Sequence, residues 1–492
     1  MQKKFILNLA LVLFLNILIK PIWIFGIDRE VQNQVGAAEY GVYFALFNFS
    51  FLLNILLDCG ITNFNNKNIA QNNHLLTKHF SSLVSLKFIL AIAYLIITLI
   101  AGLIIGYNIQ FTKLLLIFAF NQFLISFTLY LRSNIAGLHL FKTDSLISVL
   151  DRLIMIPICG ILLWTNIFHV KMTIMVFVYT QTAAYFFTAL ITFFIVAAKT
   201  HTFKLTFNWP FSIMILKQSI PFAILVLLMT FYNRIDTVML ERLLPRSTQV
   251  DQLGISGSVQ TGIYAQAYRL LDATNMIAFL FAGLLLPIFS RMLKYKESVE
   301  QLVKLSYSLL LTPAIIVAIG CSFYSHEIMQ TLYREHTDQS GPVFSVLMFC
   351  FVAVSTTYIF GTLLTANGNL KELNLMAASG MVLNIALNFL LIPRLFALGS
   401  AIAAMSTQLV MALTQVLIVQ RKFQFKINYR LLFTITIYAL GVMGISWATH
   451  NYSFNPQKWV VSFLGMVILS IFWAFISKLI SIKSLFRMVK YG

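Results

Sequence analysis

Residues 215–241 read ILKQSIPFAILVLLMTFYNRIDTVMLE, an apolar run that ends in the stretch FYNRIDTVML at 231–240. A helix needs roughly 20 apolar residues to cross a bilayer, so this run predicts a membrane span. The span carries Asn233, Arg234 and Asp236 within four residues. A charge inside a membrane is costly and usually faces a cavity, a partner or a transport pathway.

The rest of the chain has the same character. Of its 492 residues, 59% are hydrophobic and only 10% are charged, which is typical of a membrane protein. Fourteen apolar runs are long enough to span a bilayer, at about 5–27, 41–60, 81–106, 111–136, 145–166, 172–198, 215–241, 262–290, 302–324, 342–366, 374–392, 397–420, 431–449 and 458–480. We therefore predict an all-α integral membrane protein with fourteen transmembrane helices, of which the N-terminal run is a retained span and not a signal peptide.

The net charge of +19 does not indicate nucleic-acid binding, because the basic residues are scattered singly over short loops. With the N-terminus in the cytoplasm, cytoplasmic segments hold 22 of the 35 basic residues and external loops hold eight. This bias favours an even number of spans with both termini cytoplasmic. The four cysteines lie in or beside apolar runs without metal spacing, so neither disulfides nor a metal site is expected.

A short internal similarity suggests two related halves. EYGVYFAL at 39–46 and QTGIYAQAY at 260–268 share a Gly-x-Tyr at the start of the second span of each half. We predict two pseudo-symmetric six-helix lobes around a central cavity, with two further helices. The predicted division is an N-lobe at 1–198, a cytoplasmic linker at 199–214, a C-lobe at 215–420 and a C-terminal pair of spans with a tail at 421–492.

Nine charged residues fall inside the spans, and counting along the spans sorts them into two layers. The outer layer contains Lys20, Arg234, Asp236, Arg269 and Asp272. The inner layer contains Asp58, Lys87, Asp151 and Arg152, which form a candidate cytoplasmic gate or, alternatively, structural ion pairs.

Helical spacing places polar stripes on several spans. Arg234 and Asp236 should not pair, since residues two apart do not face each other. Other stripes join Asn16, Lys20 and Trp23; Gln122, Ser126 and Tyr130; Tyr264, Tyr268 and Asp272; and Asn384 and Asn388. Hydrogen bonding between helices explains single polar residues. Three cations at one depth favour a hydrated cavity for a phosphate or diphosphate.

The chain resembles the flippases of O-antigen and capsule repeat units (Wzx-type), within the superfamily that also contains lipid II flippases and multidrug-and-toxin extruders. The matching stretches are VGAAEYGVYFALFNFSFLLNILLDCGITN at 35–63, YNRIDTVML at 232–240 and TGIYAQAYRLLD at 261–272, and the resemblance extends over nearly the whole chain.

The resemblance implies a transporter, not an enzyme, which moves undecaprenyl-diphosphate-linked oligosaccharides from the inner to the outer leaflet of the bacterial cytoplasmic membrane by alternating access. It implies a V-shaped cavity lined by spans 1, 2, 7 and 8. Besides substrate and membrane lipids, a polysaccharide polymerase and a chain-length protein are candidate partners. No cofactor is expected, and a coupling ion would be H⁺ or Na⁺. The predicted cavity residues are Lys20, Asn233, Arg234, Tyr264, Tyr268, Arg269 and Asp272, with Asp236 balancing charge or supporting structure.

Three alternatives stay open. A lipid II flippase would share the cationic cavity, and essentiality for growth would favour it. A multidrug antiporter should carry an acid in span 1, which this chain lacks. A glycan polymerase or ligase would need external catalytic groups, for which His326, Glu327, Glu335, His336 and Asp338 are candidates. Because these five lie on one short connection, a solvated loop is the better interpretation.

Overall fold

The computed structural model describes residues 14–16, 18–62, 65, 69, 75–138, 140–165, 171–200, 208–245, 254–425, 428–451 and 459–479. These residues are helical apart from turns and short connections, and no strand occurs among them, as an all-α membrane protein requires. Both chain ends, and residues 201–207 of the predicted linker, lie outside the described part.

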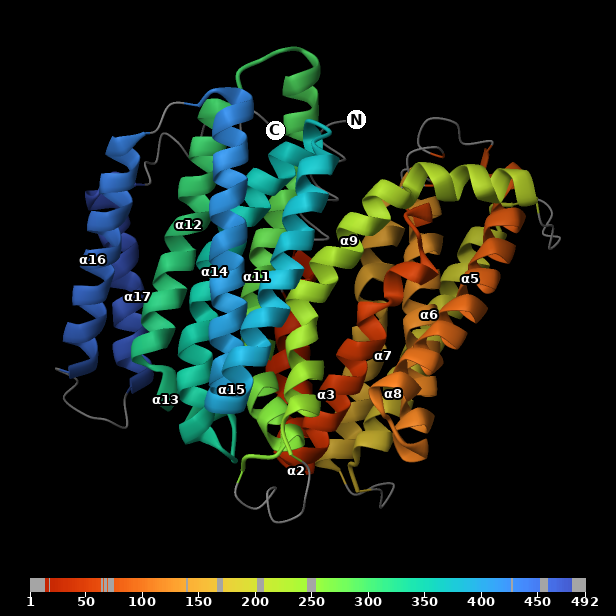
Figure 1. The fold of residues 1–492 in the computed structure, drawn as a ribbon, viewed down its shortest axis with the longest axis horizontal. Coiled ribbons are helices and arrows are strands. Elements are labelled where there is room, and N and C mark those ends of the chain that lie inside the picture. Colours follow the sequence, from red (N-terminus) through yellow and green to blue (C-terminus); the bar gives the residue numbers. More distant parts are fainter. Residues whose placement is uncertain are drawn as a thin grey trace. The chain divides into compact units, whose positions relative to one another are not determined.

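The chain forms two compact units, Met1–Val238 and Met239–Gly492 (Figure 1). The first unit contains η1 (Ile22–Asp28), α2 (Arg29–Val35), α3 (Ala37–Leu52), η2 (Asn54–Leu57), α5 (Leu75–Ile105), α6 (Ile109–Gly137), α7 (Phe141–Trp164), α8 (Ile174–Ala197) and most of α9 (Trp209–Leu243). The second contains α11 (Gly257–Lys294), α12 (Glu300–Phe323), α13 (Ser325–Leu332), α14 (Thr337–Ala366), α15 (Leu370–Phe423), α16 (Tyr429–Asn451) and α17 (Trp459–Ile476).

Among the described residues, eleven helices are long and apolar enough to span a membrane. They coincide with the predicted third to fourteenth runs, two of which are joined in α15. The first two runs coincide with the helical segments that end at Val35 and Leu52. The all-helical membrane architecture is confirmed, whereas the count of fourteen spans stays a prediction.

The 54 residues of α15 would measure about 80 Å as one straight helix, far more than a bilayer. The helix instead bends at Phe396, whose φ of 54° and ψ of −133° are not helical. Two features of the sequence cause the bend: Pro393 interrupts the hydrogen-bond ladder, and Gly399 lets the backbone approach closely. A Cβ at Gly399 would lie 2.4 Å from the carbonyl oxygen of Leu391.

Each unit packs around the fourth span of its half. In the first unit, α6 contacts α3, α5, α7 and α8. In the second, α14 contacts α11, α12 and α15, which are the second, third, and joined fifth and sixth spans of that half. The same packing scheme therefore occurs twice, which agrees with the internal similarity of the sequence.

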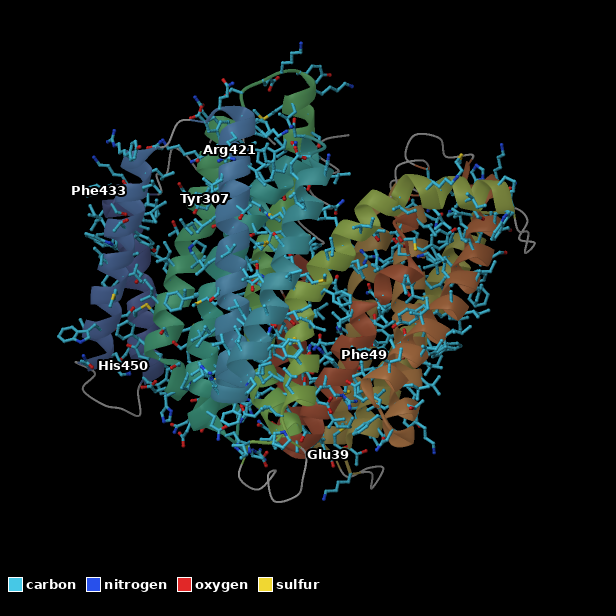
Figure 2. The ribbon with its side chains drawn as sticks, in the orientation of Figure 1. Glu39, Phe49, Tyr307, Arg421, Phe433 and His450 are labelled. Carbon is cyan, nitrogen blue, oxygen red and sulfur yellow. The ribbon has the colours of Figure 1, made fainter. Side chains whose placement is uncertain are left out.

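The last two spans, α16 and α17, pack against each other and against α12. Tyr438, Val442 and Met466 form part of the buried cluster between them. On their outward faces lie exposed apolar side chains such as Phe433, which is 67% exposed (Figure 2). An apolar outward face is the surface that lipid tails solvate.

Candidate functional site

Lys20 lies among charged groups of the first unit. It precedes η1, a seven-residue π-helical segment that begins directly after Pro21. Proline cannot donate its backbone N–H, which fits the altered helix geometry at this point. Lys20 interacts electrostatically with Arg132 on α6 and with Asp151 and Arg152 on α7. Asn16, one turn earlier, donates to the hydroxyl of Ser148 on α7 at 3.3 Å.

Arg152 is held over aromatic rings. Its guanidinium carbon lies 4.8 Å from the ring centroid of Trp23 and 6.0 Å from that of Tyr185 on α8. Its Nε lies 3.8 Å from Asp151, an ion pair longer than a direct hydrogen bond. Aromatic faces attract a cation without neutralising it. Two aromatic rings and Asp151 therefore hold the Arg152 guanidinium in place.

Arg132 is neutralised by Asp144. Its Nε and Nη2 contact the two carboxylate oxygens of Asp144 at 2.8 and 3.2 Å, in the bidentate geometry that suits arginine. Asp144 lies in the first turn of α7, where a negative charge also complements the helix dipole. Of the three cations in this cluster, Lys20 is the one without a direct carboxylate contact among the described residues.

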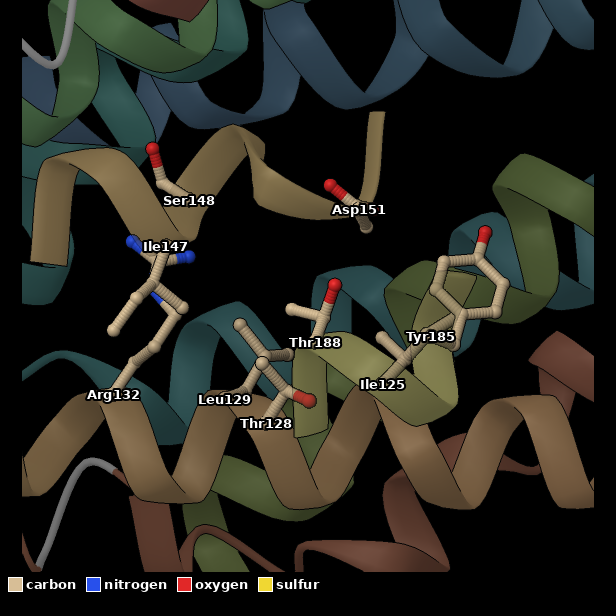
Figure 3. A pocket seen from close by; sticks show the side chains of 9 residues that line it. All are labelled: Ile125, Thr128, Leu129, Arg132, Ile147, Ser148, Asp151, Tyr185 and Thr188. Atoms are coloured by element: carbon tan, nitrogen blue, oxygen red, sulfur yellow. The ribbon is translucent and has the colours of Figure 1, made fainter. Parts of the chain in front are cut away.

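A small cavity adjoins these groups. Figure 3 shows Arg132, Ser148, Asp151 and Tyr185 around its walls, which α6, α7 and α8 supply. Its volume of about 80 Å³ has room for a few water molecules but not for a saccharide. A pocket of this size, with Arg132 and Asp151 in its walls, fits a site for ions or water, and not a site for a whole lipid-linked substrate.

The cluster corrects the two-layer assignment, which put Lys20 in the outer layer and Arg152 in the inner one. The helical path that contains Lys20 continues to Val35, so Lys20 lies about fifteen residues, roughly 22 Å of helix, before its end. Lys20 is therefore deeper than the apolar run to Ile27 suggested. The alignment of Asn16, Lys20 and Trp23 is confirmed, since Asn16 and Trp23 both contact α7 residues.

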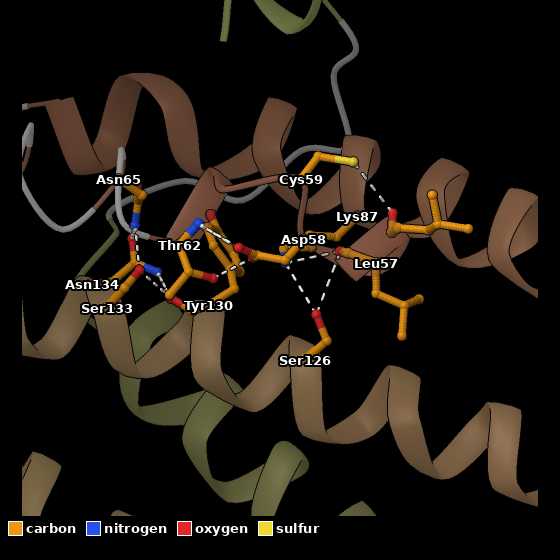
Figure 4. Close-up of polar contacts among 11 residues, drawn as sticks. Leu57, Asp58, Cys59, Thr62, Asn65, Lys87, Ser126, Tyr130, Ser133 and Asn134 are labelled. Atoms are coloured by element: carbon orange, nitrogen blue, oxygen red, sulfur yellow. Dashed lines mark hydrogen bonds and ion pairs between the residues drawn. The ribbon is translucent and has the colours of Figure 1, made fainter. Parts of the chain in front are cut away.

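Lys87 forms a second, separate polar site (Figure 4). Its ammonium donates to Asp58 Oδ1 at 2.5 Å, to the Leu57 carbonyl at 3.0 Å and to Ser126 Oγ at 3.2 Å. Three acceptors satisfy all three protons of the ammonium, although the side chain is only 1% exposed. The predicted stripe of Gln122, Ser126 and Tyr130 is confirmed, because Ser126 accepts from Lys87 and the ring of Tyr130 lies 5.8 Å from the ammonium.

This site lies where the second span is interrupted. After α3 the chain forms η2 and then a turn in which Cys59 and Gly60 both have positive φ, 44° and 83°. The interruption exposes backbone carbonyls, and Lys87 satisfies that of Leu57. Thr62 completes the turn by donating its backbone N–H and its hydroxyl to Asp58. Asp58 and Lys87 thus pair with each other, and Asp151 pairs with Arg152. Their role as a cytoplasmic gate stays a prediction.

On α9, Arg234 is half-buried and lies against α3. Its Nη1 donates to Asn48 Oδ1 at 3.5 Å, and its guanidinium lies 5.6 Å from the ring of Phe51. Asn233 donates to the Met229 carbonyl at 2.7 Å, one turn back on its own helix, and Asp236 is buried. The stretch that predicted the span therefore contacts the second span of the same unit.

On α11, Tyr264 and Tyr268 are buried and their rings stack at a centroid distance of 5.4 Å. Arg269 and Asp272 are half-buried on the same helix. These residues belong to the second unit, whereas Lys20 and Arg234 belong to the first. Convergence of Lys20, Arg234 and Arg269 on one substrate stays a prediction.

Sequence reasoning missed Arg132, Asp144 and Tyr185. Arg132 was assigned to a cytoplasmic connection and Asp144 was not assigned, because both lie at the ends of apolar runs. An Arg-x₁₁-Asp spacing across a tight turn between two spans was the available signal. Within the described ranges, no group of three or more His, Cys, Asp or Glu side chains is placed to hold a metal ion.

Comparison with known proteins places this architecture in a family. The model of the family "Polysaccharide biosynthesis protein" matches residues 6–293, more than half of the chain. Among curated proteins, no sequence matches the chain.

Solved structures share the fold. A lipid II flippase MurJ in an inward closed conformation matches with a TM-score of 0.73 and 13% identity, over 96% of this chain and 97% of that one. An inward-facing multidrug resistance transporter of the MATE family matches with a TM-score of 0.59 and 14% identity, over 86% and 99%. A MOP superfamily transporter from Pyrococcus furiosus, described as having a binding pocket of reverse polarity, matches with a TM-score of 0.53 and 13% identity, over 85% and 94%. The chain therefore belongs to the polysaccharide biosynthesis protein family and has the fold of the flippases and transporters of the MOP superfamily.

Proposed function

We propose that the protein flips undecaprenyl-diphosphate-linked oligosaccharide repeat units from the inner to the outer leaflet of the bacterial cytoplasmic membrane. The observation that carries the proposal is the set of cations inside the spans of a polysaccharide-family chain. Lys20 and Arg152 are only partly neutralised within the first unit. Such groups bind an oxyanion while a membrane-embedded path lets its lipid tail stay in the bilayer.

The proposed roles follow from the side chains. Lys20, Arg152, Arg234 and Arg269 would contact the diphosphate, since ammonium and guanidinium groups are its natural donors. Asn233, Tyr264, Tyr268 and Asp272 would contact sugar hydroxyls next to it. Binding the same headgroup on either side of the membrane requires these groups to face alternate sides in turn.

The test is a complementation experiment in the strain from which the chromosomal copy has been deleted. Arg234→Ala, Arg269→Ala and Lys20→Ala should abolish surface polysaccharide while the protein stays in the membrane, and lipid-linked repeat units should accumulate at the inner leaflet. Arg421→Ala is the matched control, because Arg421 is an exposed arginine at the end of α15 (Figure 2). Full display by all three variants would overturn the proposal.

A lipid II flippase is the second candidate, favoured by the fold match to MurJ over nearly both chains. A diphosphate is common to both substrates, so the cations do not separate them. Complementation separates them: this protein should fail to sustain growth of cells depleted of their own lipid II flippase, and its deletion should leave cells viable. Rescue of growth would assign lipid II as the substrate.

A further inference from the structure

A second cavity lies in the second unit, and none of the proposed diphosphate cations lines it. Its volume is about 600 Å³, and Tyr324, α13 and the ends of α16 and α17 line it. Its walls carry two aromatic rings, Tyr324 and Trp459, together with the hydrogen-bonding side chains of Glu327, Gln330, His450 and Asn451. Figure 2 shows His450 at the end of α16.

The polar groups of the cavity are held in place before any ligand arrives. His450 Nε2 lies 2.9 Å from Glu327 Oε1, and this contact ties the end of α16 to α13. The ring of Tyr324 meets the His450 ring edge to face at 5.1 Å and donates its hydroxyl to Thr449 at 3.0 Å. Such fixed side chains reduce the entropy that binding must remove.

One acceptor atom in the cavity wall lacks a hydrogen-bond donor among the described residues. Glu327 Oε2 is buried and has no hydrogen-bond partner among the described residues, although Oε1 is engaged by His450. Leaving a buried carboxylate oxygen without a donor costs free energy. The Glu327 side chain is 28% exposed, so a turn of its carboxylate would present this oxygen to a ligand hydroxyl, which would recover the cost.

The lining excludes several ligand classes. A carboxylate in the wall disfavours a phosphate, and the described side chains include no set of three ligands for a metal ion. The polar walls disfavour a lipid tail. An uncharged polyol remains: its hydroxyl groups would pair with the carboxylate, amides and imidazole, and its C–H face would lie on an aromatic ring.

We propose that this cavity binds the saccharide portion of the transported molecule as it leaves the protein. The inference rests on the proposed function for the identity of the sugar. The charge bias of the loops predicts that residues 325–341 and 450–458 are external, which is the side on which a flipped glycan would emerge. The site would retain the glycan at the outer leaflet after the diphosphate has left its cations.

The experiment measures binding of free oligosaccharide repeat units, released by mild acid from the lipid-linked pool of the producing strain. The full chain is held in lipid nanodiscs, and binding is followed by isothermal titration calorimetry. Saturable binding is expected, and Glu327→Gln and Trp459→Leu should each weaken it by about tenfold, the effect of losing one good contact. Glu335→Gln is the matched control, because Glu335 is an exposed carboxylate on the connection after α13 and does not line the cavity.

Three results would overturn the proposal: no saturable binding by the unmodified protein, normal binding by both cavity variants, or equal weakening by Glu335→Gln. Two cavity variants are used so that misfolding of one, seen by gel filtration, leaves the other as a test. The assay needs no transport. Failure of the flippase proposal would appear as normal polysaccharide display by the arginine variants, and failure of the cavity proposal as absent saccharide binding.

Discussion

Lys87 illustrates how a charge is tolerated inside this membrane protein. The ammonium is buried and its three protons reach a carboxylate, a backbone carbonyl and a hydroxyl. The three acceptors lie in two places. Asp58 and Leu57 lie at the interruption of the second span, and Ser126 lies on the polar stripe of α6. Lys20 differs, because its charged neighbours include two arginines and it has no direct carboxylate contact among the described residues. This contrast separates a structural cation from a candidate binding cation.

We expect Lys87→Met alone to destabilise the protein by about 1–3 kcal/mol, since it leaves the partly exposed Asp58 carboxylate without its cation while Thr62 still donates to it. Asp58→Asn should also destabilise the protein, because it leaves the buried Lys87 ammonium without its carboxylate. The double variant should recover a large part of the loss. Thermal unfolding in detergent, followed by gel filtration, measures all three. If the double variant is as unstable as the sum of the single variants, the two residues do not act as a pair.

Helices of this protein are shaped by breaks as much as by apolar runs. The turn after α3 uses two consecutive residues with positive φ, and a Cβ at Gly60 would lie 2.7 Å from Cβ of Ser219 on α9. The bend of α15 uses Pro393 and Gly399, and Asn388 bridges it by accepting from Ser400 at 2.9 Å. The predicted alignment of Asn384 and Asn388 is confirmed, since Asn388 donates to Asn384. These polar residues stabilise the turn between the two parts of α15.

Gly399→Ala should destabilise the fold by several kcal/mol. The new Cβ would clash with backbone atoms of Leu391, which cannot move aside. Gly444→Ala on α16 is the matched control, because a Cβ there meets nothing within 4 Å. That control should be neutral or slightly stabilising, by roughly 0.5–1 kcal/mol, since alanine is the better helix former. The yield of monodisperse protein and its midpoint of thermal unfolding measure both. Equal behaviour of the two variants would contradict the close approach at the bend.

At the scale of the whole molecule, two units repeat one packing scheme around α6 and α14, and α16 and α17 are added to α12. The repeated scheme agrees with the short Gly-x-Tyr similarity of the sequence, although most of the two halves differ. Exposed apolar faces such as that around Phe433 set the membrane-facing surface (Figure 2). The orientation of this surface in the membrane follows from charge bias alone and is open to direct test.

Single cysteines in a variant without the four native cysteines should report that orientation. A cysteine at Gln339, which is exposed in the first turn of α14, should react with a membrane-impermeant maleimide added to intact cells. A cysteine at Lys296, exposed between α11 and α12, should react only after the membrane is opened. The reverse pattern would place the termini outside and would also move the proposed saccharide cavity to the cytoplasmic side.

The sequence by itself determined the membrane class, the all-helical architecture and the family. These features depend on local apolar length and residue order, because a bilayer forces every apolar run of this size into a helix. It also predicted the alignments of Ser126 with Tyr130 and of Asn384 with Asn388, since helical periodicity is local. It could not determine which charges meet. Lys20 joins Arg132 and Arg152 because the first helix continues past the apolar run to Val35, and Glu327 meets His450 across more than a hundred residues. Such pairings depend on how helices pack, and only the tertiary structure decides that.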